Sequence, residues 1–462
     1  MAITKNRQSE ETISRMARKA FPDKKIAAVK ELTEGMCNVT YDIRFEDGSE
    51  SILKIAAKDR SGNTSNEIGL MKAEIDAMKL VSANCSFKVA DVQYYDTSNT
   101  ICDGNYFFME KLKGDNYSFV KGDMSEEAVA AIDTEIGKIS RELSNVKNPG
   151  FGFLGDDMRY DSLFGFVRQM LENLIKDAKR RDIDILYDEK TFMDRLEKDR
   201  HAFEKVRSAS LVHWDMWEGN VFVKDEHVSG IIDWERALWG EPFMDDRFRM
   251  HNRGRNFLEG FGQTTFSEDE SVRLRWYDVI LYLTMMIEVY YREFEDKGQY
   301  YWAKEMLQKS MGMPVYKQAD ISDADILIEI YNSAFRDDFL RYGECPAYGR
   351  SREDMEQSVR DFPKIIAYDQ GKPVGVISYK EEGPGKYYIG CLAVVKEEQG
   401  RGIGTLLMKH FMSEHPDWKE LTLVTPKDNE QNIRFYTGRF GFEIVGEEED
   451  GAVTVFWFRL SR

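Results

Sequence analysis

Residues 211–240 read LVHWDMWEGNVFVKDEHVSGIIDWERALWG and place an Asp, an Asn and a second Asp among aromatic and β-branched residues. Phosphoryl transfer needs a carboxylate that accepts the proton of the attacking hydroxyl, together with amide and carboxylate oxygens that hold magnesium on the phosphates. Asp215, Asn220 and Asp233 supply those three groups. The flanks of the stretch are typical of strands, and a loop held between strands often presents catalytic groups. The stretch therefore predicts a site for phosphoryl transfer.

The spacing also matches the catalytic loop of protein kinases, H-x-D-x-x-x-x-N, at His213, Asp215 and Asn220. In that pattern the Asp is the base and the Asn holds magnesium. Asp233, in IIDWE on the next strand, takes the place of the second magnesium-binding acid, but no Phe-Gly follows it. We therefore predict a kinase-like site in a protein that is not a protein kinase, with His213 bracing the loop.

A lysine on an upstream strand and a glutamate on the following helix complete such a site, because the glutamate orients the lysine toward the α- and β-phosphates. Lys54 in SILKIA fits the first role. Glu74 fits the second role better than Glu67, because Glu74 lies within an amphipathic helical run. These residues extend the predicted nucleotide site to the N-terminal part of the chain.

Two further segments are candidates to contact the nucleotide. The turn TEGMCNVTY contains a single glycine and no G-x-G-x-x-G, and the amides of Gly35 and Asn38 are placed to cover the phosphates. The segment FFMEKLKG joins the two predicted lobes. Backbone groups of Glu110 and Leu112 are therefore candidates to hydrogen-bond a purine edge.

The segments HWDMWEGN, IIDWE and GEPFMD resemble the aminoglycoside phosphotransferase-like kinase family, over roughly residues 20–305. The resemblance implies a bilobal kinase fold that phosphorylates hydroxyls of small molecules with ATP or GTP and Mg²⁺. The site residues that it implies are Lys54 for the phosphates, Asp215 as the base, Asn220 and Asp233 as metal ligands, and Asp245 as the acid that steadies the catalytic loop. Trp214 stands where the family commonly has glycine, which shifts the expected substrate more than the expected activity.

A second stretch, IGCLAVVKEEQGRGIGTLLMKHF, reads as a strand, a Gly-rich turn and a helix. Such a turn aims backbone N–H groups and a helix N-terminus at an anion, so that a pyrophosphate fits without a metal. A nucleotide P-loop is excluded because G-K-[ST] is absent, and the glycine spacing departs from the dinucleotide-binding fingerprint. We therefore expect a pyrophosphate-binding turn of another kind.

The turn QGRGIG resembles the [QR]-x-x-G-x-[GA] signature of the GNAT acetyltransferase superfamily, and NEQNIRFYTGRFGFEIVGE resembles the segment after its coenzyme A site. The resemblance covers about residues 315–460 and implies acetyl transfer from acetyl-CoA to an amine. It places the pantetheine arm beside the strand residues Leu392 to Val394. The residues that it implies for the pyrophosphate are Gln399, Gly400, Arg401, Gly402 and Gly404.

Acetyl transfer also needs an acid for the departing thiolate. Tyr436 is the candidate, because a phenol can reprotonate a thiolate, and a core tyrosine on an amphipathic helix is the alternative for this position. Asn432, one turn earlier, is expected to contact the cofactor. No base for the amine is identified; the acids in the expected pocket loops are Asp337, Asp338, Glu344 and Glu381.

The 462-residue chain is 42% hydrophobic and carries a formal net charge of −18. This length exceeds one ordinary core, and the composition supports packed globular domains. The charge disfavours nucleic acid and favours a cationic small-molecule substrate, although acidity that serves only solubility is the commoner explanation. Five scattered cysteines indicate neither a disulfide framework nor a zinc site. Because no signal core or 18-residue apolar run occurs, we expect a cytoplasmic protein that does not enter a membrane.

The strand and helix patterns and the two resemblances predict an α+β chain of two domains, a bilobal protein-kinase-like fold followed by a GNAT mixed α/β fold. The expected boundaries are 1–310 for the first domain, with an N-lobe at about 1–110 and a helical C-lobe at about 115–310, and 315–462 for the second. A linker is placed at 310–314, because a helix ends near Gly312 and Pro314 follows. One helix is predicted over 275–306. Its carboxylates would suit a polyamine substrate; the alternative is a core-facing apolar stripe with a solvated acidic face.

Together these features predict a bifunctional enzyme, a Mg²⁺-dependent small-molecule O-kinase fused to an acetyl-CoA-dependent N-acetyltransferase. An aminoglycoside carries both hydroxyls and amines, which would explain why the two activities share a chain. One alternative is a kinase for a metabolite or another antibiotic, fused to an acetylase for an unrelated amine. Another is that one half serves only as a ligand-binding or regulatory module. The sequence does not choose between ATP and GTP or give the oligomeric state.

Overall fold

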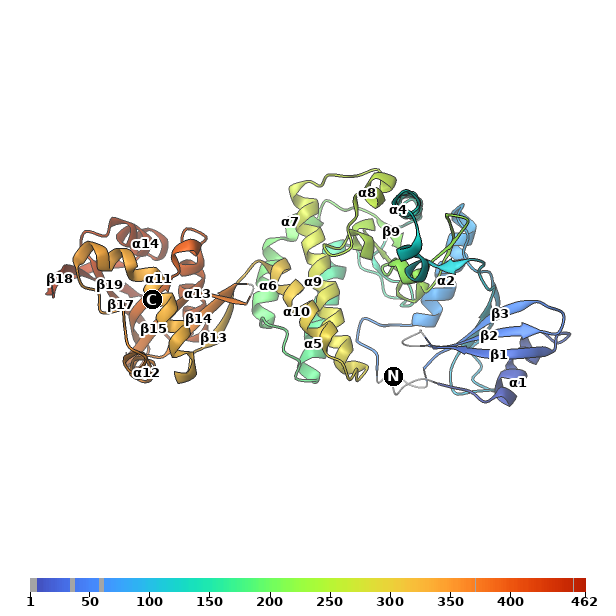
Figure 1. Cartoon of the computed structure of the whole chain (residues 1–462), viewed down its shortest axis with the longest axis horizontal. Coiled ribbons are helices and arrows are strands. Elements are labelled where there is room, and N and C mark those ends of the chain that lie inside the picture. Colours follow the sequence, from blue (N-terminus) through green and yellow to red (C-terminus); the bar gives the residue numbers. More distant parts are fainter. Residues whose placement is uncertain (1–5, 34–37, 58–61, 370, 452) are drawn as a thin grey trace. The chain divides into compact units, whose positions relative to one another are not determined.

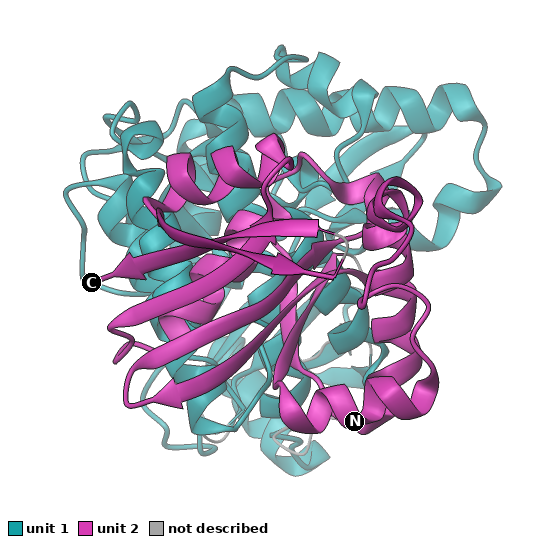
Figure 2. Cartoon of the chain, turned by 90° about the vertical axis from the view of Figure 1, so that its left-hand side faces the viewer, with its two compact units in different colours: residues 1–311 teal, residues 312–462 magenta. Residues whose placement is uncertain are grey.

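The computed structural model describes residues 6–33, 38–57, 62–369, 371–451 and 453–462. The chain divides into two compact units, Met1–Met311 and Gly312–Arg462, which Figure 2 colours separately. The division falls within the linker expected at 310–314. Gly35, a candidate to cover the nucleotide, lies outside the described residues.

The N-lobe of the first unit is an antiparallel sheet with the strand order β1-β2-β3-β5-β4 (Figure 1). Ile13 and Met16 of the first helix pack with Ile43 and Leu53 of the sheet in one buried cluster. The alternation of TYDIRF between buried and more exposed residues is the strand pattern expected from the sequence. The elements are α1 (Glu10–Ala20), β1 (Ile26–Leu32), β2 (Val39–Phe45), β3 (Glu50–Ile55), α2 (Leu70–Asn84), β4 (Val92–Asp96) and β5 (Tyr106–Met109).

The C-lobe is mostly helical and contains two small sheets, β11-β10-β6 and β7-β9-β12-β8. The catalytic-loop sequence connects a strand of one sheet to a strand of the other. The helices are α3 (Tyr117–Val120), α4 (Glu126–Leu143), α5 (Leu163–Arg180), α6 (Glu189–Lys198), α7 (Arg200–Phe203), α8 (Arg255–Phe261), α9 (Glu268–Tyr291) and α10 (Gly298–Met311). The strands are β6 (Asp115–Asn116), β7 (Lys147–Asn148), β8 (Gly152–Phe153), β9 (Ala209–Val212), β10 (Val221–Lys224), β11 (His227–Ile231) and β12 (Leu238–Gly240). The short 3₁₀ turns are η1 (Lys121–Asp123), η2 (Glu218–Asn220), η3 (Trp234–Arg236), η4 (Pro242–Met244) and η5 (Asp246–Phe248).

The single helix predicted over 275–306 is wrong. The structure has two helices, because α9 ends at Tyr291 and α10 begins at Gly298. Glu293 adopts a left-handed backbone conformation with φ 53°, which an α-helix does not accommodate. Several acids that were assigned to a helix face therefore lie in the connection. Glu288 remains on α9, but it is buried in ion pairs with Arg236 and Arg292 and does not face solvent.

Helices α4 and α8 cross at a pair of glycines. A Cβ atom on Gly137 of α4 would lie 2.1 Å from the carbonyl oxygen of Phe257, and one on Gly260 of α8 would lie 2.0 Å from that of Thr134. Both distances are too short for non-bonded atoms. The two backbones therefore approach this closely only because both positions lack a side chain.

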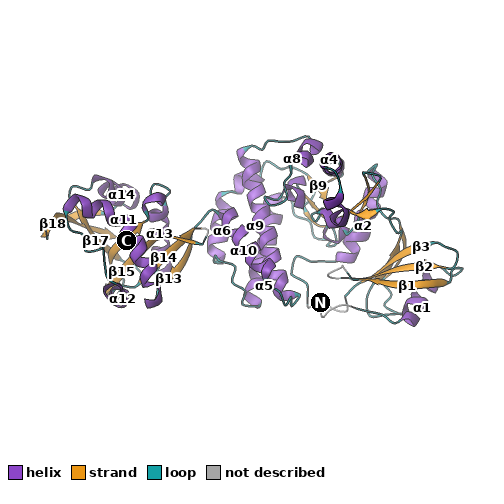
Figure 3. Ribbon diagram, in the orientation of Figure 1, coloured by secondary structure: helices purple, strands orange, loops and turns teal. Residues whose placement is uncertain are grey.

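The second unit is built on a seven-stranded mixed sheet with the order β13-β14-β15-β16-β17-β19-β18. Helices cover both faces (Figure 3): one buried cluster includes Leu407 of α13 and Tyr436 of α14, and the other includes Leu327 of α11 and Met355 of α12. The strands are β13 (Val315–Gln318), β14 (Lys364–Asp369), β15 (Lys372–Gly383), β16 (Lys386–Val394), β17 (Glu420–Pro426), β18 (Glu443–Asp450) and β19 (Val453–Ser461). The helices are η6 (Ile321–Asp323), α11 (Ala324–Tyr342), α12 (Arg352–Asp361), η7 (Lys396–Glu398), α13 (Ile403–Glu414) and α14 (Glu430–Phe440).

Each unit thus has its own sheet or sheets and its own buried clusters, and the α+β fold class expected from the sequence is confirmed. Within the described ranges, none of the helices combines the length and the apolar character that crossing a bilayer requires.

Candidate active sites

The catalytic loop of the first unit starts directly after β9 and is braced by His213. The ring of His213 is fully buried, and its Nε2 donates to the carbonyl of Ile232 at 2.9 Å. Its Nδ1 accepts the backbone N–H of Asp215 at 3.2 Å. Burial lowers the pKa of His213 to about 4. The neutral ring therefore fixes the backbone at Asp215 and takes no part as a charged group.

Trp214 occupies the position where a glycine was expected from the family resemblance, and its φ of 75° is left-handed. This conformation is unfavourable for a bulky side chain. The N–H of Trp214 donates to Oδ2 of Asp245 at 3.0 Å, the contact expected of a loop-steadying acid. The guanidinium of Arg236 lies 5.6 Å from the centre of the indole ring. Trp214 thus adopts the left-handed backbone conformation that a glycine at this position would adopt without strain.

Asp215 lies in a partly buried, acidic environment. Burial raises the pKa of Asp215 to about 7; Arg236 opposes the rise and Asp246 adds to it. Nδ2 of Asn220 donates to the backbone carbonyl of Asp215 at 2.8 Å, so the two predicted site residues are in direct contact. A carboxylate with a pKa near neutrality suits a general base.

Lys54 joins the two lobes of the first unit. Its Nζ lies 2.5 Å from Oε1 of Glu74 on α2 and also forms an ion pair with Asp233, which follows β11. Burial lowers the pKa of Lys54, but the charges of Asp233 and Glu74 more than offset this and raise it above its usual value. Burial raises the pKa of Glu74 to about 7 against the opposing charge of Lys54. Glu67, the other candidate partner, instead pairs with Arg292 at 2.6 Å.

Asn220 and Asp233 present the donor types that Mg²⁺ prefers. Asn220 uses its amide nitrogen toward Asp215, which leaves the amide oxygen as a ligand. Asp233 is the more accessible of the two, with its side chain 38% exposed beside Lys54. The described residues contain no cluster of three or more His, Cys, Asp or Glu side chains that could hold a metal. A site with one carboxylate, one amide and phosphate oxygens fits Mg²⁺, which rarely uses an all-protein cage.

The segment predicted to face the purine is only partly available. The N–H of Glu110 donates to the carbonyl of Asp91 at 2.9 Å, so only its carbonyl can meet a base edge. The side chain of Leu112 lies against Gly230, where a Cβ would be 2.6 Å away. Nδ2 of Asn38 donates to Oε2 of Glu235 at 2.8 Å, which ties the edge of the predicted phosphate turn to the segment after Asp233.

Arg236, two residues after Asp233, was not predicted to belong to the site. It pairs with Glu288 and with Glu67 at 3.0 Å, its guanidinium lies near the Trp214 ring, and its charge opposes the rise in the pKa of Asp215. Its position next to the IIDWE motif is the one signal that could have identified it.

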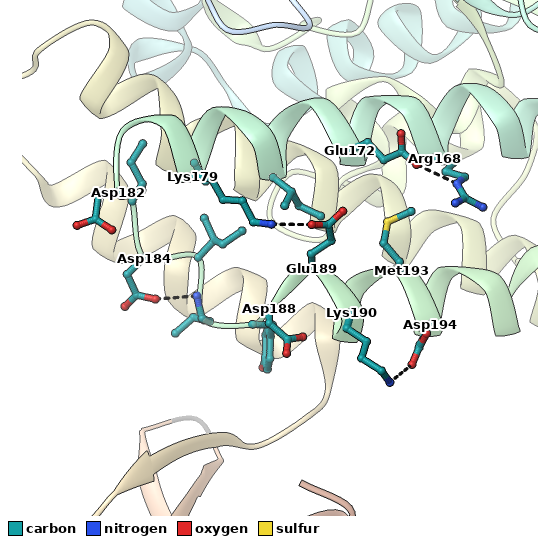
Figure 4. A pocket seen from close by; sticks show the side chains of 16 residues that line it. Arg168, Glu172, Lys179, Asp182, Asp184, Asp188, Glu189, Lys190, Met193 and Asp194 are labelled. Carbon is teal, nitrogen blue, oxygen red and sulfur yellow. Dashed lines mark hydrogen bonds and ion pairs between the residues drawn. The ribbon is translucent and has the colours of Figure 1, made fainter. Parts of the chain in front are cut away.

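A cavity of about 860 Å³ opens between α5 and α6, away from these residues (Figure 4). Its charged lining is largely paired internally, with Lys179 and Glu189 2.6 Å apart and Lys190 and Asp194 2.7 Å apart. None of the predicted site residues lines it.

In the second unit, β16 and β17 form a parallel pair that ends early. Their register runs from Lys386 opposite Glu420 to Tyr388 opposite Thr422, and β16 continues beyond it. Leu392 and Val394 lie in that continuation. A bulge re-aims the strand just before them, because Cys391 pairs with Ser378 while Ile389 pairs with the next residue. An extended ligand arm can therefore lie beside Leu392 to Val394.

The Gly-rich turn follows β16 and leads into α13. Gly400 and Gly402 have positive φ values of 81° and 86°, and no side chain caps the first N–H groups of α13, so these amides remain for an anion. Gln399 donates its side-chain amide to the carbonyl of Val394 at 3.1 Å. A Cβ on Gly404 would lie 3.8 Å from the side chain of Leu392. Arg401 is held by Glu398 and, at 3.1 Å, by Asp369.

Tyr436 and Asn432 lie on α14. Tyr436 is 8% exposed and packs against Phe442 and Phe458 with ring centres 5.7 and 5.8 Å away. Burial raises the pKa of Tyr436, and its ring belongs to the buried cluster that also contains Leu407 and Phe411 of α13. Nδ2 of Asn432 donates to Oγ1 of Thr425 on β17 at 3.2 Å. Asn432 is therefore tied to β17, whereas Tyr436 packs among aromatic side chains of the core.

The candidate bases remain dispersed. Asp337 is paired with Lys396 at 2.5 Å, and Asp338, next to it, has its pKa raised by burial. Glu344 lies near the β18–β19 turn, 2.6 Å from where Gly451 would carry a Cβ. Glu381 is exposed on β15. No single one of these acids is marked by the geometry as the base.

The comparisons with known proteins assign a family to each of the two units. The model of the phosphotransferase enzyme family matches residues 28–273, more than half of the chain. The chain therefore belongs to that family. The model of the acetyltransferase (GNAT) family matches residues 325–442. Both are families of transferases, so the chain is a transferase that fuses a phosphotransferase to an acetyltransferase. The comparison with curated proteins gave no match.

Several solved structures are similar to the first unit. A thermostable mutant of aminoglycoside phosphotransferase APH(4)-Ia, in a ternary complex with AMP-PNP and hygromycin B, is 15% identical with a TM-score of 0.47, and the match covers 65% of this chain and 98% of that one. A protein from Haemophilus somnus 129PT with a provisional assignment as fructosamine-3-kinase is 16% identical with a TM-score of 0.48 and coverages of 65% and 97%. The GDP complex of a mutant aminoglycoside 2'-phosphotransferase-IIIa is 15% identical with a TM-score of 0.46 and coverages of 66% and 98%.

Proposed function

We propose that the first unit transfers the γ-phosphoryl group of a nucleoside triphosphate, ATP or GTP, to a hydroxyl of a small molecule with Mg²⁺. The observation that carries this proposal is the pair of contacts made by Lys54, which links Glu74 of the N-lobe to Asp233 of the C-lobe. That linkage supports the proposal, because it puts the lysine proposed for the phosphates next to a proposed metal ligand.

In the proposed reaction, Asp215 accepts the proton of the substrate hydroxyl as that oxygen attacks the γ-phosphorus. Lys54 binds the α- and β-phosphates and Glu74 holds it in place. Asn220 and Asp233 would hold Mg²⁺, which neutralises phosphate charge when bound. The bond from the γ-phosphorus to the bridging oxygen breaks, and the nucleoside diphosphate leaves.

For the second unit we propose transfer of the acetyl group of acetyl-CoA to an amine. The pyrophosphate lies on the amides of residues 399–404 and the pantetheine arm beside Leu392 to Val394. The amine nitrogen attacks the thioester carbon, the carbon–sulfur bond breaks, and Tyr436 protonates the departing thiolate. The proton lost by the amine passes to solvent or to an acid of the pocket loops.

An aminoglycoside is the substrate class that we propose for both units. Such a molecule carries the hydroxyls and amines that the two reactions need, and its positive charge complements a chain of net charge −18. The fusion of two different group transfers in one chain supports a shared substrate.

Product masses test the proposal directly. The purified chain is incubated with a panel of aminoglycosides together with ATP, GTP or acetyl-CoA, and phosphoryl or acetyl additions are read by mass spectrometry. Asp215→Asn should abolish only the phosphoryl addition, and Tyr436→Phe should lower only the acetyl addition. Additions of both kinds to one compound support the shared substrate. Nucleotide turnover that survives in Asp215→Asn would overturn the catalytic assignment.

A further inference from the structure

We infer that Arg247 is a positioning residue for phosphoryl transfer, because its side chain fixes the catalytic loop on the far side of Asp215 from His213. The inference rests on the kinase function proposed above. Arg247 lies on η5 and is only 3% exposed. Its Nε donates to the carbonyl of Met216, the residue after Asp215, at 2.9 Å. No spacing motif connects the two, which are 31 residues apart.

The same guanidinium also holds the turn that presents Asn220. Its Nη1 lies 3.3 Å from Oε1 of Glu218, the first residue of that turn, and 3.4 Å from Oδ1 of Asp133 on α4. Lys121 pairs with the same oxygen of Glu218 at 2.9 Å. A planar, permanently charged fork can meet a carbonyl and two carboxylates at once. Arg247 therefore ties the base and a metal-binding residue to one buried point.

The loop needs such anchoring because Trp214 is left-handed. Residues in that conformation persist only where the surroundings over-determine it. Asp245 accepts the N–H of Trp214 at 3.0 Å and the backbone N–H of Arg247 at 3.3 Å. The loop is thus held on both sides of Asp215, at Trp214 by Asp245 and at Met216 by Arg247. Neither contact uses a side chain that the proposed reaction assigns to the nucleotide or the substrate.

The test is Arg247→Lys in the full-length chain. A lysine keeps the charge but offers one compact donor group, which cannot replace the fork. We expect kcat for phosphorylation to fall on the order of 10- to 100-fold through misplacement of Asp215, with the KM for the nucleotide unchanged. Activity is measured as ADP release from ATP with magnesium and the acceptor found in the mass experiment, or as slow release to water if no acceptor is found.

Arg249→Lys is the matched control. Arg249 is equally buried, at 1% exposure, but it donates to the backbone carbonyls of Phe243, of Asp245 at 3.3 Å and of Leu274 at 3.1 Å. It contacts neither the catalytic loop nor the Asp245 carboxylate that holds Trp214. It should lower the midpoint of thermal unfolding without changing kcat at temperatures where the chain stays folded. The acetylation rate is measured on both variants, and an unchanged rate shows that the second unit is folded.

The outcomes separate the inference from the function beneath it. If the wild-type chain adds no phosphoryl group to any acceptor and releases no ADP, the proposed kinase function is wrong; if Asp215→Asn retains phosphoryl transfer, the assignment of Asp215 as the base is wrong. If Asp215→Asn is inactive but a folded Arg247→Lys keeps the wild-type kcat, or loses no more than Arg249→Lys, the positioning role is wrong. Should Arg247→Lys fail to fold, Glu218→Gln serves instead: it keeps the bond to Met216, weakens the second anchor, and should lower kcat by a smaller factor, again without raising the nucleotide KM.

Discussion

The environment of Asp215 raises its pKa, which suits a general base but makes the ionised side chain destabilising for the fold. Burial raises its pKa to about 7 in the folded protein, whereas an unperturbed aspartate titrates at about 4. The folded chain therefore binds the proton more tightly than the unfolded chain. The resulting stability is present at low pH and is lost as the pH rises through 7. Above that pH the charged base is a net penalty for folding.

Asp215→Asn should for this reason stabilise the first unit at pH 8 while it abolishes phosphorylation. We expect the midpoint of thermal unfolding to rise by roughly 2–4 °C, with no gain at pH 4, where the wild-type carboxyl is already neutral. Thermal unfolding at the two pH values, without nucleotide or metal, measures the difference. A gain of equal size at both pH values would contradict the raised pKa.

Lys54 and Glu74 form a buried ion pair. Removing one of the two side chains leaves an unpaired buried charge, which lowers the free energy of unfolding. Lys54→Met leaves Glu74 without its cation, and breaking a buried pair from one side typically costs about 3–5 kcal/mol of unfolding free energy. The double variant Lys54→Met/Glu74→Gln should recover much of that loss and remain inactive. Denaturant unfolding and ADP release are measured on both variants. If the double variant is no more stable than the single one, the two side chains are not coupled.

At the scale of elements, most single helices and strands of the N-lobe follow from alternation and helical spacing in the sequence. The two helices within 275–306 could not be separated in this way, because apolar residues recur at helical spacing on both sides of the short polar connection. The break appears only in the structure, where Glu293 has a left-handed backbone conformation. The edge strand β18 was also not expected, since all its residues are exposed and leave no alternation. Periodicity identifies elements that bury one face, and it fails where no face is buried.

The crossing of α4 and α8 is set by glycines, and it makes a prediction at this scale. Gly137→Ala should push the two helices apart, because the new Cβ would meet a backbone oxygen at 2.1 Å. We expect a loss of roughly 1–3 kcal/mol, as for overpacked cores, despite the better helix propensity of alanine. Denaturant unfolding measures it. Gly122→Ala is the control, since nothing lies within 4 Å of its Cβ position, and an equal loss there would contradict the packing argument.

The candidate sites were predicted unevenly. Lys54, Asp215, Asn220 and Asp233 are marked by types and spacing, and the structure brings them together as expected. The anchors Arg236 and Arg247 were not predicted, because their partners are distant in sequence: Arg236 pairs with Glu67 and Glu288, and Arg247 bonds the backbone carbonyl of Met216. The role of Tyr436 as the acid stays a prediction, because its burial and aromatic packing equally fit the alternative of a core tyrosine.

For the whole molecule, the two units have separate cores, and each should fold alone. The fragments 1–311 and 312–462 follow the division of the chain. Expressed separately, the first should keep the phosphotransferase activity and the second the acetyltransferase activity, each with a single cooperative unfolding transition. Calorimetry and product masses test this on the two fragments and the full chain. Loss of either activity in a folded fragment would show that the units depend on one another.

The early end of the β16–β17 pair also affects the energetics of the second unit. Only three residue pairs join the two strands, so the sheet is weakest along this seam. A molecule that binds between them only in the folded state stabilises that state. When the free ligand concentration is about a hundred times the dissociation constant, binding adds about 2.7 kcal/mol to the free energy of unfolding. Amide protons of β16 and β17 should then exchange with solvent more slowly when acetyl-CoA is present than when it is absent. The concentration of the acetyl donor would therefore set the stability of the second unit.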